Sequence, residues 1–387
     1  MNEKYAPLFE PLDLPNRIRL RNRLVMAPMT HVSSRADGTV SDEEIAYYVR
    51  RAQGVGMVVT AATWVAPNGG LPGAPAADRD EVVPGLRRLA AAIREQGAKA
   101  ILQIFHAGRQ STMTGDLVSA SAVPESKEGA AVPRELTEKE VGELVLAYGQ
   151  AARRAVEAGF DGVEIHGGNG NLLHQFFSPY TNRRSDRYGG TTEGRMTFAL
   201  EIVDEVKRVV AEAAQSPFIV GYRLSPEEAE TPGITMAETL PFVDALAAKG
   251  LDYLSVSLVR YDAAPRRGID DSRPRLSIIQ ERVGEGLPVI GVGSVRTPED
   301  AVGALGTGIG LVALGRELVM EPDWAKLVAE GREEAIRTTL SVNDQRKLII
   351  PDGMWRLMFS IPGWFPVEEE VGEAAKEAAK DVVEEAT

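Results

Sequence analysis

Short apolar runs alternate along the chain with longer amphipathic segments. The runs are rich in Val, Ile and Leu and mostly lack alternating polar residues, which is typical of strands that are buried on both faces. The predicted strands are residues 24–27, 57–61, 100–105, 162–166, 218–224, 253–257, 288–292 and 311–314. Strands of this kind belong to parallel sheets whose two faces are covered by other elements.

Segments with the apolar spacing of helices separate these strands. The predicted helices are residues 41–53, 84–96, 137–158, 194–213, 235–249, 275–283, 297–305 and 322–330. The segment 137–158, for example, begins with a Thr-Glu-Lys-Glu capping box and stops at Gly159. Strands and helices in strict alternation predict an α/β fold, a closed (β/α)8 TIM barrel. An open doubly wound sheet is the alternative, but it usually has a glycine-rich turn after its first strand, and residues 28–31 contain no glycine.

Two segments lie outside the barrel pattern. We therefore divide the chain into a barrel domain, residues 1–330, and a C-terminal helical extension, residues 331–387. Residues 1–23 are expected to form an extended lid or plug over the bottom of the barrel. The aromatic piece 348–367 is expected to pack on the barrel or on a neighbouring subunit, which favours a homo-oligomer. The acidic tail from about residue 368 has Glu and Lys at helical spacing, which predicts a solvated helix.

Composition and charge exclude several kinds of chemistry. The chain has no cysteine, which removes disulfides, thiolate catalysis and cysteine-ligated metal centres. Its 387 residues include 56 acidic and 43 basic ones, a net charge of -13, which disfavours nucleic acid and anionic membranes as partners. The four histidines have no metal-ligand spacing, so no metal is expected. With no apparent signal peptide or membrane span, we expect a cytoplasmic protein that acts on a small molecule.

Polar side chains gather at the ends of the predicted strands, where barrel enzymes place their chemistry. Thr30 follows the first strand, Gln103 lies in the third, and His166 ends the fourth and is followed by Asn169. Arg223 lies within the fifth strand, in an otherwise apolar run. A buried guanidinium keeps its charge and needs an anionic or carbonyl-rich partner, so Arg223 indicates a bound group. A strand cap for Thr30 and core networks for Gln103 and His166 are the structural alternatives.

The last two strands are followed by residues suited to a phosphate group. Gly293 and Ser294 come after the seventh strand, and Gly315 and Arg316 come after the eighth. Barrels commonly bind phosphate at this place through backbone N–H groups and a helix N-terminus, and Arg316 adds a positive charge. We therefore predict a phosphate site between these two loops.

Six motifs surround these residues. They are Asn-Arg-Leu-Val-Met-Ala-Pro-Met-Thr at 22–30, Gln-Ile-Phe-His-Ala-Gly-Arg at 103–109, Glu-Ile-His-Gly-Gly-Asn at 164–169, Phe-Phe-Ser-Pro-Tyr-Thr-Asn-Arg-Arg-Ser-Asp-Arg-Tyr-Gly-Gly at 176–190, Gly-Tyr-Arg-Leu-Ser at 221–225 and Leu-Gly-Arg-Glu-Leu at 314–318. Over about residues 5–330 the chain thereby resembles the Old Yellow Enzyme family of NAD(P)H:flavin oxidoreductases. The resemblance implies an FMN-dependent enzyme that takes hydride from NADH or NADPH and passes it to an electrophilic acceptor.

The same resemblance implies a role for each candidate residue. Arg223 would lie beside the N1/O2 edge of the flavin, where negative charge accumulates on reduction. His166 and Asn169 would hold the carbonyl oxygen of the acceptor and polarise a conjugated alkene. Thr30 would hydrogen-bond near the O4/N5 edge and tune the potential. The ring would be lined by Pro28, Met29, Thr30, Ala62 and Gln103, and the phosphate would be held by Gly293, Ser294, Gly315 and Arg316.

One residue departs from the family pattern. The family usually has a tyrosine two residues after the second oxygen-binding residue, where it gives a proton to the α-carbon of the acceptor, whereas this chain has Asn171. A carboxamide has no usable acidic proton. Water, His31, Tyr180 or Tyr261 would then supply the proton, or the acceptor would be a quinone or nitro compound that needs none. Two further functions stay open: a flavin-bearing sensor with weak turnover, and a non-flavin barrel enzyme that acts on a sugar phosphate.

Overall fold

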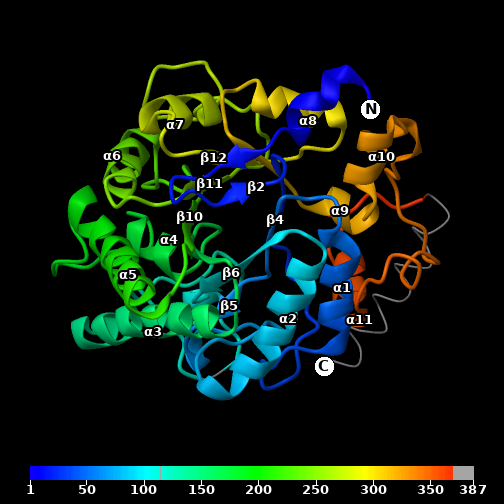
Figure 1. Ribbon diagram of the computed structural model, residues 1–387. Helices are drawn as coiled ribbons and strands as arrows, with labels where there is room; N and C mark the ends of the chain where they lie inside the picture. Colours follow the sequence, from blue (N-terminus) through cyan, green and yellow to red (C-terminus); the bar gives the residue numbers. More distant parts are fainter. Residues whose placement is uncertain (114, 369–387) are drawn as a thin grey trace.

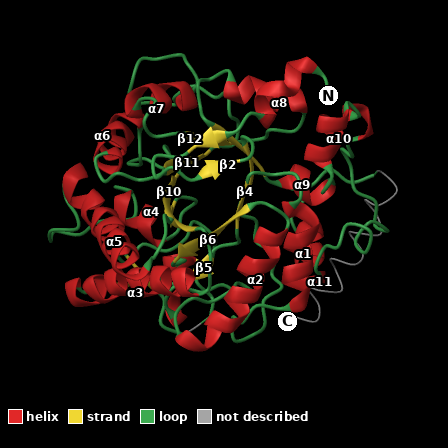
Figure 2. Ribbon diagram, viewed as in Figure 1, coloured by secondary structure: helices red, strands yellow, loops and turns green. Residues whose placement is uncertain are grey.

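Eight parallel strands close into a ring in the computed structural model, which describes residues 1–113 and 115–368 (Figure 1). The strands are β3 Leu24–Met26, β4 Met57–Val59, β6 Lys99–Phe105, β9 Gly162–Gly167, β10 Ile219–Leu224, β11 Tyr253–Ser257, β12 Val289–Val292 and β13 Leu311–Leu314. They pair in this order, and β13 pairs back to β3. Figure 2 shows them as a central ring inside a layer of helices. The predicted TIM barrel is confirmed, and every strand begins within one residue of its predicted position.

Helices connect the strands and cover the outside of the ring. They are α1 Asp42–Ala52, α2 Val83–Glu95, α3 Glu138–Glu157, α4 Leu172–Phe177, α5 Thr192–Ala213, α6 Met236–Ala247, α7 Arg275–Val283, α8 Pro298–Leu305, α9 Arg316–Met320 and α10 Trp324–Glu330. The short helices α4 and α9 were not predicted, because one or two turns are too few to show a hydrophobic period. Short strands β5 Thr63–Trp64, β7 Val118–Ser119 and β8 Arg134–Glu135 lie in the loops.

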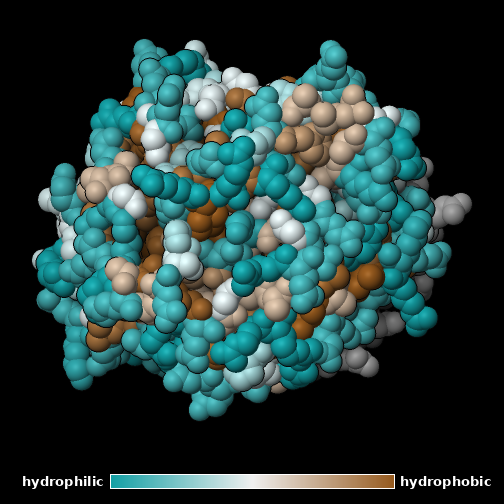
Figure 3. Space-filling model, viewed as in Figure 1, coloured by the Kyte–Doolittle hydropathy of each residue, from teal (hydrophilic) through white to brown (hydrophobic). Residues whose placement is uncertain are grey.

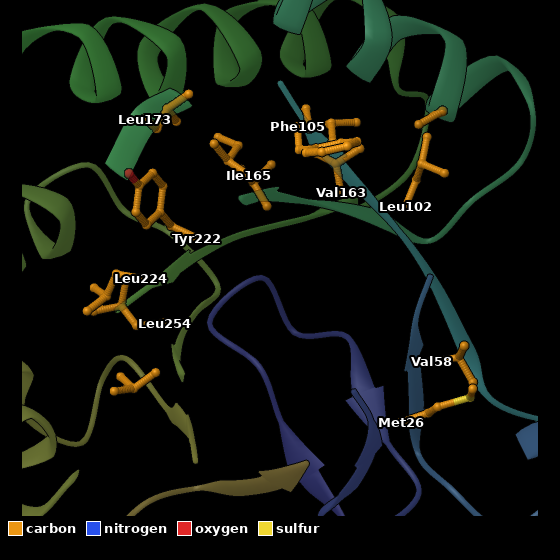
Figure 4. Packing of buried hydrophobic residues seen from close by; sticks show 14 of the residues in the cluster. Met26, Val58, Leu102, Phe105, Val163, Ile165, Leu173, Tyr222, Leu224 and Leu254 are labelled. Carbon is orange, nitrogen blue, oxygen red and sulfur yellow. The ribbon is translucent and has the colours of Figure 1, made fainter. Parts of the chain in front are cut away.

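Alternate residues of each barrel strand point outward and inward. Outward side chains such as Leu102, Ile165 and Tyr222 pack beneath the helices, as Figure 4 shows. Inward side chains form a smaller apolar cluster that contains Val25, Ala27, Met57, Val59, Ile101, Ile219, Tyr253, Ile290, Leu311 and Ala313. Because most of these residues come early in their strands, the barrel is filled with side chains toward its N-terminal end.

The N-terminal segment packs against that end of the barrel. Its hairpin, β1 Leu12–Asp13 paired with β2 Arg19–Leu20, brings Leu14 into the inner apolar cluster. The residues before the hairpin form a 3-10 helix, Glu3–Phe9, and not the extended chain that we predicted. The side chain of Asn2 caps this helix by accepting a backbone hydrogen bond, which favours the helical start.

The C-terminal extension folds back onto the barrel as far as the structure describes it. Its described part contains a short 3-10 helix, Glu333–Ala335, the α-helix α11 Asp352–Ser360, and a β-bridge that joins Leu340 to Val367. Arg51 of α1 anchors the middle of the extension to the barrel. Its buried guanidinium donates a hydrogen bond to the carbonyl oxygen of Leu348 over 2.8 Å. The predicted helical tail lies outside the described residues.

The face of the molecule that Figure 3 shows is mainly polar. Figure 3, in the same view as Figure 1, shows hydrophilic residues over most of this face, with apolar ones scattered between them. None of the helices in residues 1–113 and 115–368 is long and apolar enough to cross a membrane.

Candidate active site

A cavity of about 520 Å³ lies at the C-terminal ends of the barrel strands. Its volume is within the range of small-molecule and cofactor sites, roughly 300–1,000 Å³. All of the predicted site residues line it: Pro28, Met29, Thr30, Ala62, Gln103, His166, Asn169, Arg223, Gly293, Ser294, Gly315 and Arg316. They converge because parallel strands all end at the same side of the barrel. Position at a strand end was therefore enough to identify this part of the cavity wall.

A buried polar layer lies inside the barrel between the apolar cluster and the cavity. Gln103 of β6 is in register with Glu164 of β9, and Arg223 of β10 is in register with Ser255 of β11. Gln103 Nε2 donates a hydrogen bond to Glu164 Oε1 over 2.6 Å. The Arg223 guanidinium donates to Ser255 Oγ over 3.1 Å and to Ser257 Oγ over 2.9 Å. These contacts give the side-chain nitrogen of Gln103 a partner and fix the direction of the guanidinium.

Glu164 and Arg223 carry opposite charges in this layer. Burial raises the pKa of the Glu164 carboxyl, and the positive charge of Arg223 opposes that rise. Burial also lowers the pKa of Arg223, against the attraction of Glu164. Arg223 Nε has no hydrogen-bond partner among the described residues. Neutral hydroxyls compensate a buried guanidinium only in part, so Arg223 is well placed for an electron-rich group in the cavity.

His166 ends β9 and is held by the side chain of Asn171. Asn171 Nδ2 lies 2.9 Å from His166 Nε2 and 3.1 Å from the carbonyl oxygen of Gly168. Because a carbonyl can only accept, the Asn171 nitrogen is the donor in both contacts, and His166 Nε2 is the acceptor. The proton of the neutral ring is therefore on Nδ1, which has no partner in the described part of the chain. Burial and the charge of Arg223 hold the pKa of His166 well below its usual value, which keeps the ring neutral.

Asn169 follows His166 in a left-handed backbone conformation. Its φ is +56°, which asparagine tolerates better than most residues do. The backbone N–H of Asn169 donates to Ser225 Oγ over 2.9 Å, and its side-chain Nδ2 donates to Ser257 Oγ over 3.2 Å. Asn169 is exposed at the mouth of the cavity, whereas His166 is buried in the wall. The two predicted oxygen-binding residues thus line the same cavity, where His166 is held by Asn171 and Asn169 is held by Ser257.

The loops after β12 and β13 form the predicted phosphate end. A Cβ at Gly293 would lie 2.8 Å from the backbone nitrogen of Tyr261, so only glycine fits there. Arg316 donates hydrogen bonds to Ser294 Oγ over 3.3 Å and to the carbonyl oxygen of Trp364 over 3.0 Å. No carboxylate of the described residues lies within 4.0 Å of this guanidinium. Its charge is therefore available to an anion.

Other parts of the cavity wall were not predicted. The farthest in sequence is Trp364 of the C-terminal extension, and no sequence pattern connects it to a strand end. Further lining residues that were not predicted are Leu71, Phe105, Gln110, Ser257, Leu258, Val259, Val295 and Glu317. Most of them are apolar or lie in loops, where residue type alone gives no signal of a site.

The three side chains that we considered as replacement proton donors are not brought to this cavity. His31 is buried behind the cavity wall, where it lines a small neighbouring cavity with Thr30 and Ala62, and its Nε2 lies 3.1 Å from the Glu44 carboxylate. Tyr261 lines a neighbouring cavity on the outer side of Gly293. Tyr180 lies beside the guanidinium of Arg183, whose centre is 5.9 Å from the ring. Of the proton sources that we considered, water is the one that does not require a side chain of His31, Tyr180 or Tyr261 to line the cavity.

Comparisons with known proteins decide the family. Residues 7–335 match the NADH:flavin oxidoreductase / NADH oxidase family. This chain belongs to that family. A Bacillus subtilis protein named as a probable NADH-dependent flavin oxidoreductase, YqiG, is 48% identical over 374 residues, which is 95% of this chain and 100% of the relative. The NADH:fumarate oxidoreductase of Klebsiella pneumoniae is 40% identical over 90% of this chain, which spans only 38% of that longer protein.

Solved structures of Old Yellow Enzyme homologues agree with this assignment. The homologue from Zymomonas mobilis has a TM-score of 0.75 and 25% identity, over 90% of this chain and 98% of that one. Morphinone reductase has a TM-score of 0.71 and 28% identity, over 84% of this chain and 89% of its own. The predicted resemblance is confirmed, and the chain is an FMN-dependent NAD(P)H oxidoreductase of the Old Yellow Enzyme type.

The residues of the cavity fit FMN. Arg223 lines the cavity as a buried guanidinium, and its positive charge suits a ring system on which negative charge accumulates on reduction. The uncompensated guanidinium of Arg316 and the close backbone at Gly293 suit a phosphate at the other end. The two arginines come from different parts of the barrel, because Arg223 lies within β10 and Arg316 follows β13.

His106, which follows β6, is expected to make the fold sensitive to acid. Its buried ring accepts a hydrogen bond from Gly108 N over 3.0 Å and lies 3.1 Å from Asn68 Oδ1, and burial lowers its pKa from 6.5 to about 3. Between these pH values the unfolded chain binds a proton that the folded chain does not. The free energy of unfolding therefore falls as pH falls through this window, by up to ~1.4 kcal/mol per pH unit.

Urea unfolding of the wild type and of His106→Gln at about pH 7 and about pH 5.5 measures this contribution. We expect the variant to lose less stability than the wild type does over this interval, because glutamine does not titrate. All other titrating groups are common to both proteins, so they cancel in the comparison. An equal loss of stability in the two proteins would show that His106 is not the source of this acid sensitivity.

Proposed function

We propose that this enzyme reduces an electrophilic small molecule, either an activated alkene, a quinone or a nitro compound, with electrons from NADH or NADPH. FMN would supply the redox chemistry when bound, namely the transfer of hydride through its N5 from the nicotinamide to the acceptor in a ping-pong cycle. The observation that carries the proposal is the meeting of Arg223 and His166 in one cavity, where they are register neighbours on β10 and β9.

Arg223 would provide a fixed positive charge where negative charge develops. Its bonds to Ser255 and Ser257 orient the guanidinium before the reaction, so no reorganisation is needed during it. The site is buried, which makes such a charge more effective than it would be in water. Thr30 and Gln103 would line the same ring from the neighbouring strand ends.

His166 and Asn169 would hold the carbonyl oxygen of the acceptor. His166 is neutral and carries its proton on Nδ1, so this is the ring position that can donate a hydrogen bond. Asn169 offers an amide at the mouth of the cavity. Two neutral donors on one oxygen would draw electron density from a conjugated alkene without adding a net charge.

The relatives support an alkene as the acceptor. One is named an NADH:fumarate oxidoreductase, and another, from Vibrio harveyi, is named an NADH:acrylate oxidoreductase and is 38% identical over 91% of this chain. This chain spans 38% and 36% of those two proteins. Fumarate and acrylate are both alkenes conjugated to a carboxyl group, which is the arrangement that oxygen-binding donors would activate.

A spectrum of the purified protein followed by anaerobic mixing tests the proposal. We expect flavin absorption bands that bleach on addition of NADH or NADPH and recover on addition of an enone, a quinone or a nitro compound. A flavin that neither nicotinamide bleaches would contradict the reductase and favour a sensor. Protein that stays colourless after FMN is supplied would contradict the flavin site itself.

A further inference from the structure

The C-terminal extension forms part of the cofactor cavity although the family match ends at residue 335. Trp364 lines the cavity together with Gly293, Gly315 and Arg316, the residues of the predicted phosphate end. We propose that residues 361–368, here called the strap, retain FMN and that Trp364 is a cofactor-binding residue. The proposal rests on the flavin-dependent function proposed above and on the predicted role of Arg316 at the phosphate end.

A hydrogen bond connects the strap directly to the predicted phosphate-binding arginine. The carbonyl oxygen of Trp364 accepts from one terminal nitrogen of Arg316 over 3.0 Å, and Ser294 Oγ accepts from the other over 3.3 Å. These two neutral acceptors orient the guanidinium and leave its charge unbalanced. A guanidinium has five N–H donors, so further donors stay free for phosphate oxygens. The strap thus positions the group that would bind the phosphate.

The strap is held to the rest of the chain at its far end. Leu340 N donates to the carbonyl oxygen of Pro366 over 3.0 Å, and Glu368 N donates to the carbonyl oxygen of Leu340 over 3.0 Å. Phe365 is buried and packs edge-on against Trp364, with ring centroids 4.9 Å apart. These contacts fix the backbone that follows Trp364, and the indole lies in the cavity wall.

The outer side of the strap faces solvent. Ile361 is 44% exposed, and Pro362, Gly363 and Pro366 are also exposed. A segment with one side on the cavity and the other in water acts as a cover, because a ligand beneath it is shielded from solvent. Loss of the Trp364 side chain would admit water to the phosphate end and remove an aromatic contact, so FMN would dissociate faster.

The test compares FMN release from Trp364→Ala with release from Trp355→Ala. Trp355 is a matched control, because it lies in the same extension on α11, is half-buried and packs against Phe359, and does not line the cavity. Flavin fluorescence on dilution of each holoenzyme gives the dissociation rate, and titration of deflavinated protein gives the Kd. We expect at least about tenfold faster release and weaker binding for Trp364→Ala, because the loss of one large aromatic side chain from a ligand contact is enough for a change of this size.

The controls separate a role at the cofactor from general loosening. Trp355→Ala is expected to stay within about twofold of the wild type, and Trp364→Phe, which keeps an aromatic ring, is expected to lie near the wild type. Hydrogen exchange supplies a second readout: the strap amides should exchange more slowly with FMN bound than with riboflavin, which lacks the phosphate.

Three other results would contradict the proposal that the strap retains FMN. Wild-type release from Trp364→Ala, equal acceleration in both tryptophan variants, or equal exchange with FMN and riboflavin would each reject it. Failure of the wild type to bind FMN at all would instead reject the proposed function, so the two failures are distinguishable.

Discussion

Arg223→Ala is expected to slow reduction of the bound FMN by NADH about 100-fold and to lower its midpoint potential. Removal of one preorganised group that stabilises developing negative charge typically costs a factor of about 100 to 1,000. Arg223 is such a group, because it is buried, oriented by Ser255 and Ser257, and unpaired at Nε. Anaerobic stopped-flow bleaching measures the rate, and a redox titration measures the potential.

A second arginine of the cavity provides the matched control. Arg316→Ala removes the same charge from the opposite end, where it is predicted to contact phosphate. We expect this variant to bind FMN more weakly but, once saturated with FMN, to bleach at nearly the wild-type rate. Arg223→Lys should recover part of the rate, because it keeps the charge and loses the forked geometry. An unchanged bleaching rate in Arg223→Ala would refute the role of Arg223 beside the flavin.

The Arg223→Ala variant is expected to fold. The substitution removes the charge that holds down the pKa of Glu164, so this buried carboxyl takes up a proton more readily. The 2.6 Å contact between Gln103 and Glu164 can persist, because Gln103 Nε2 can donate to the carbonyl oxygen of a neutral carboxyl as well as to a carboxylate. Circular dichroism and thermal unfolding would detect a structural defect separately from the kinetics.

The barrel and most of its cavity could be predicted because both follow from strand ends. Buried parallel strands appear as continuous apolar runs, so their positions are visible without any knowledge of pairing. Once the strands close into a ring, residues such as Thr30, Arg223 and Arg316 must meet at one side, whatever the loops do. The arginine within an apolar strand was informative because burial of a charge needs a partner.

The remaining parts of the site could not be predicted, because they depend on contacts, mostly between residues far apart in sequence, which hydrophobic periodicity does not reveal. Glu164 was visible only as a motif residue, and its pairing with Gln103 needs the register of two strands far apart in sequence. Trp364 reaches the cavity because the extension turns back, and its direction is set by Arg51 and Leu340, which lie far from it along the chain. The contact of Asn171 with His166 depends on the rotamers of both side chains.

Asn171→Tyr is expected to raise turnover of an enone by at least about tenfold over Asn171→Phe, and to change quinone turnover little. A positioned general acid typically contributes about 100- to 10,000-fold, and a phenol has a transferable proton where the native carboxamide has none. Asn171 lines the cavity, so the tyrosine hydroxyl would enter it. Steady-state kcat with NADH and each acceptor, measured for both variants and the wild type, gives the ratios.

Phenylalanine is the reference because Asn171 also holds His166. Both substitutions remove the 2.9 Å bond to His166 Nε2 and the 3.1 Å bond to Gly168, so any loss from a freed imidazole is common to both variants. The ratio of tyrosine to phenylalanine therefore isolates the hydroxyl, and the comparison of enone with quinone isolates the proton that only the enone needs at carbon. If the ratio were the same for both acceptors, the hydroxyl would be acting on binding and not as a proton donor, which would contradict the prediction.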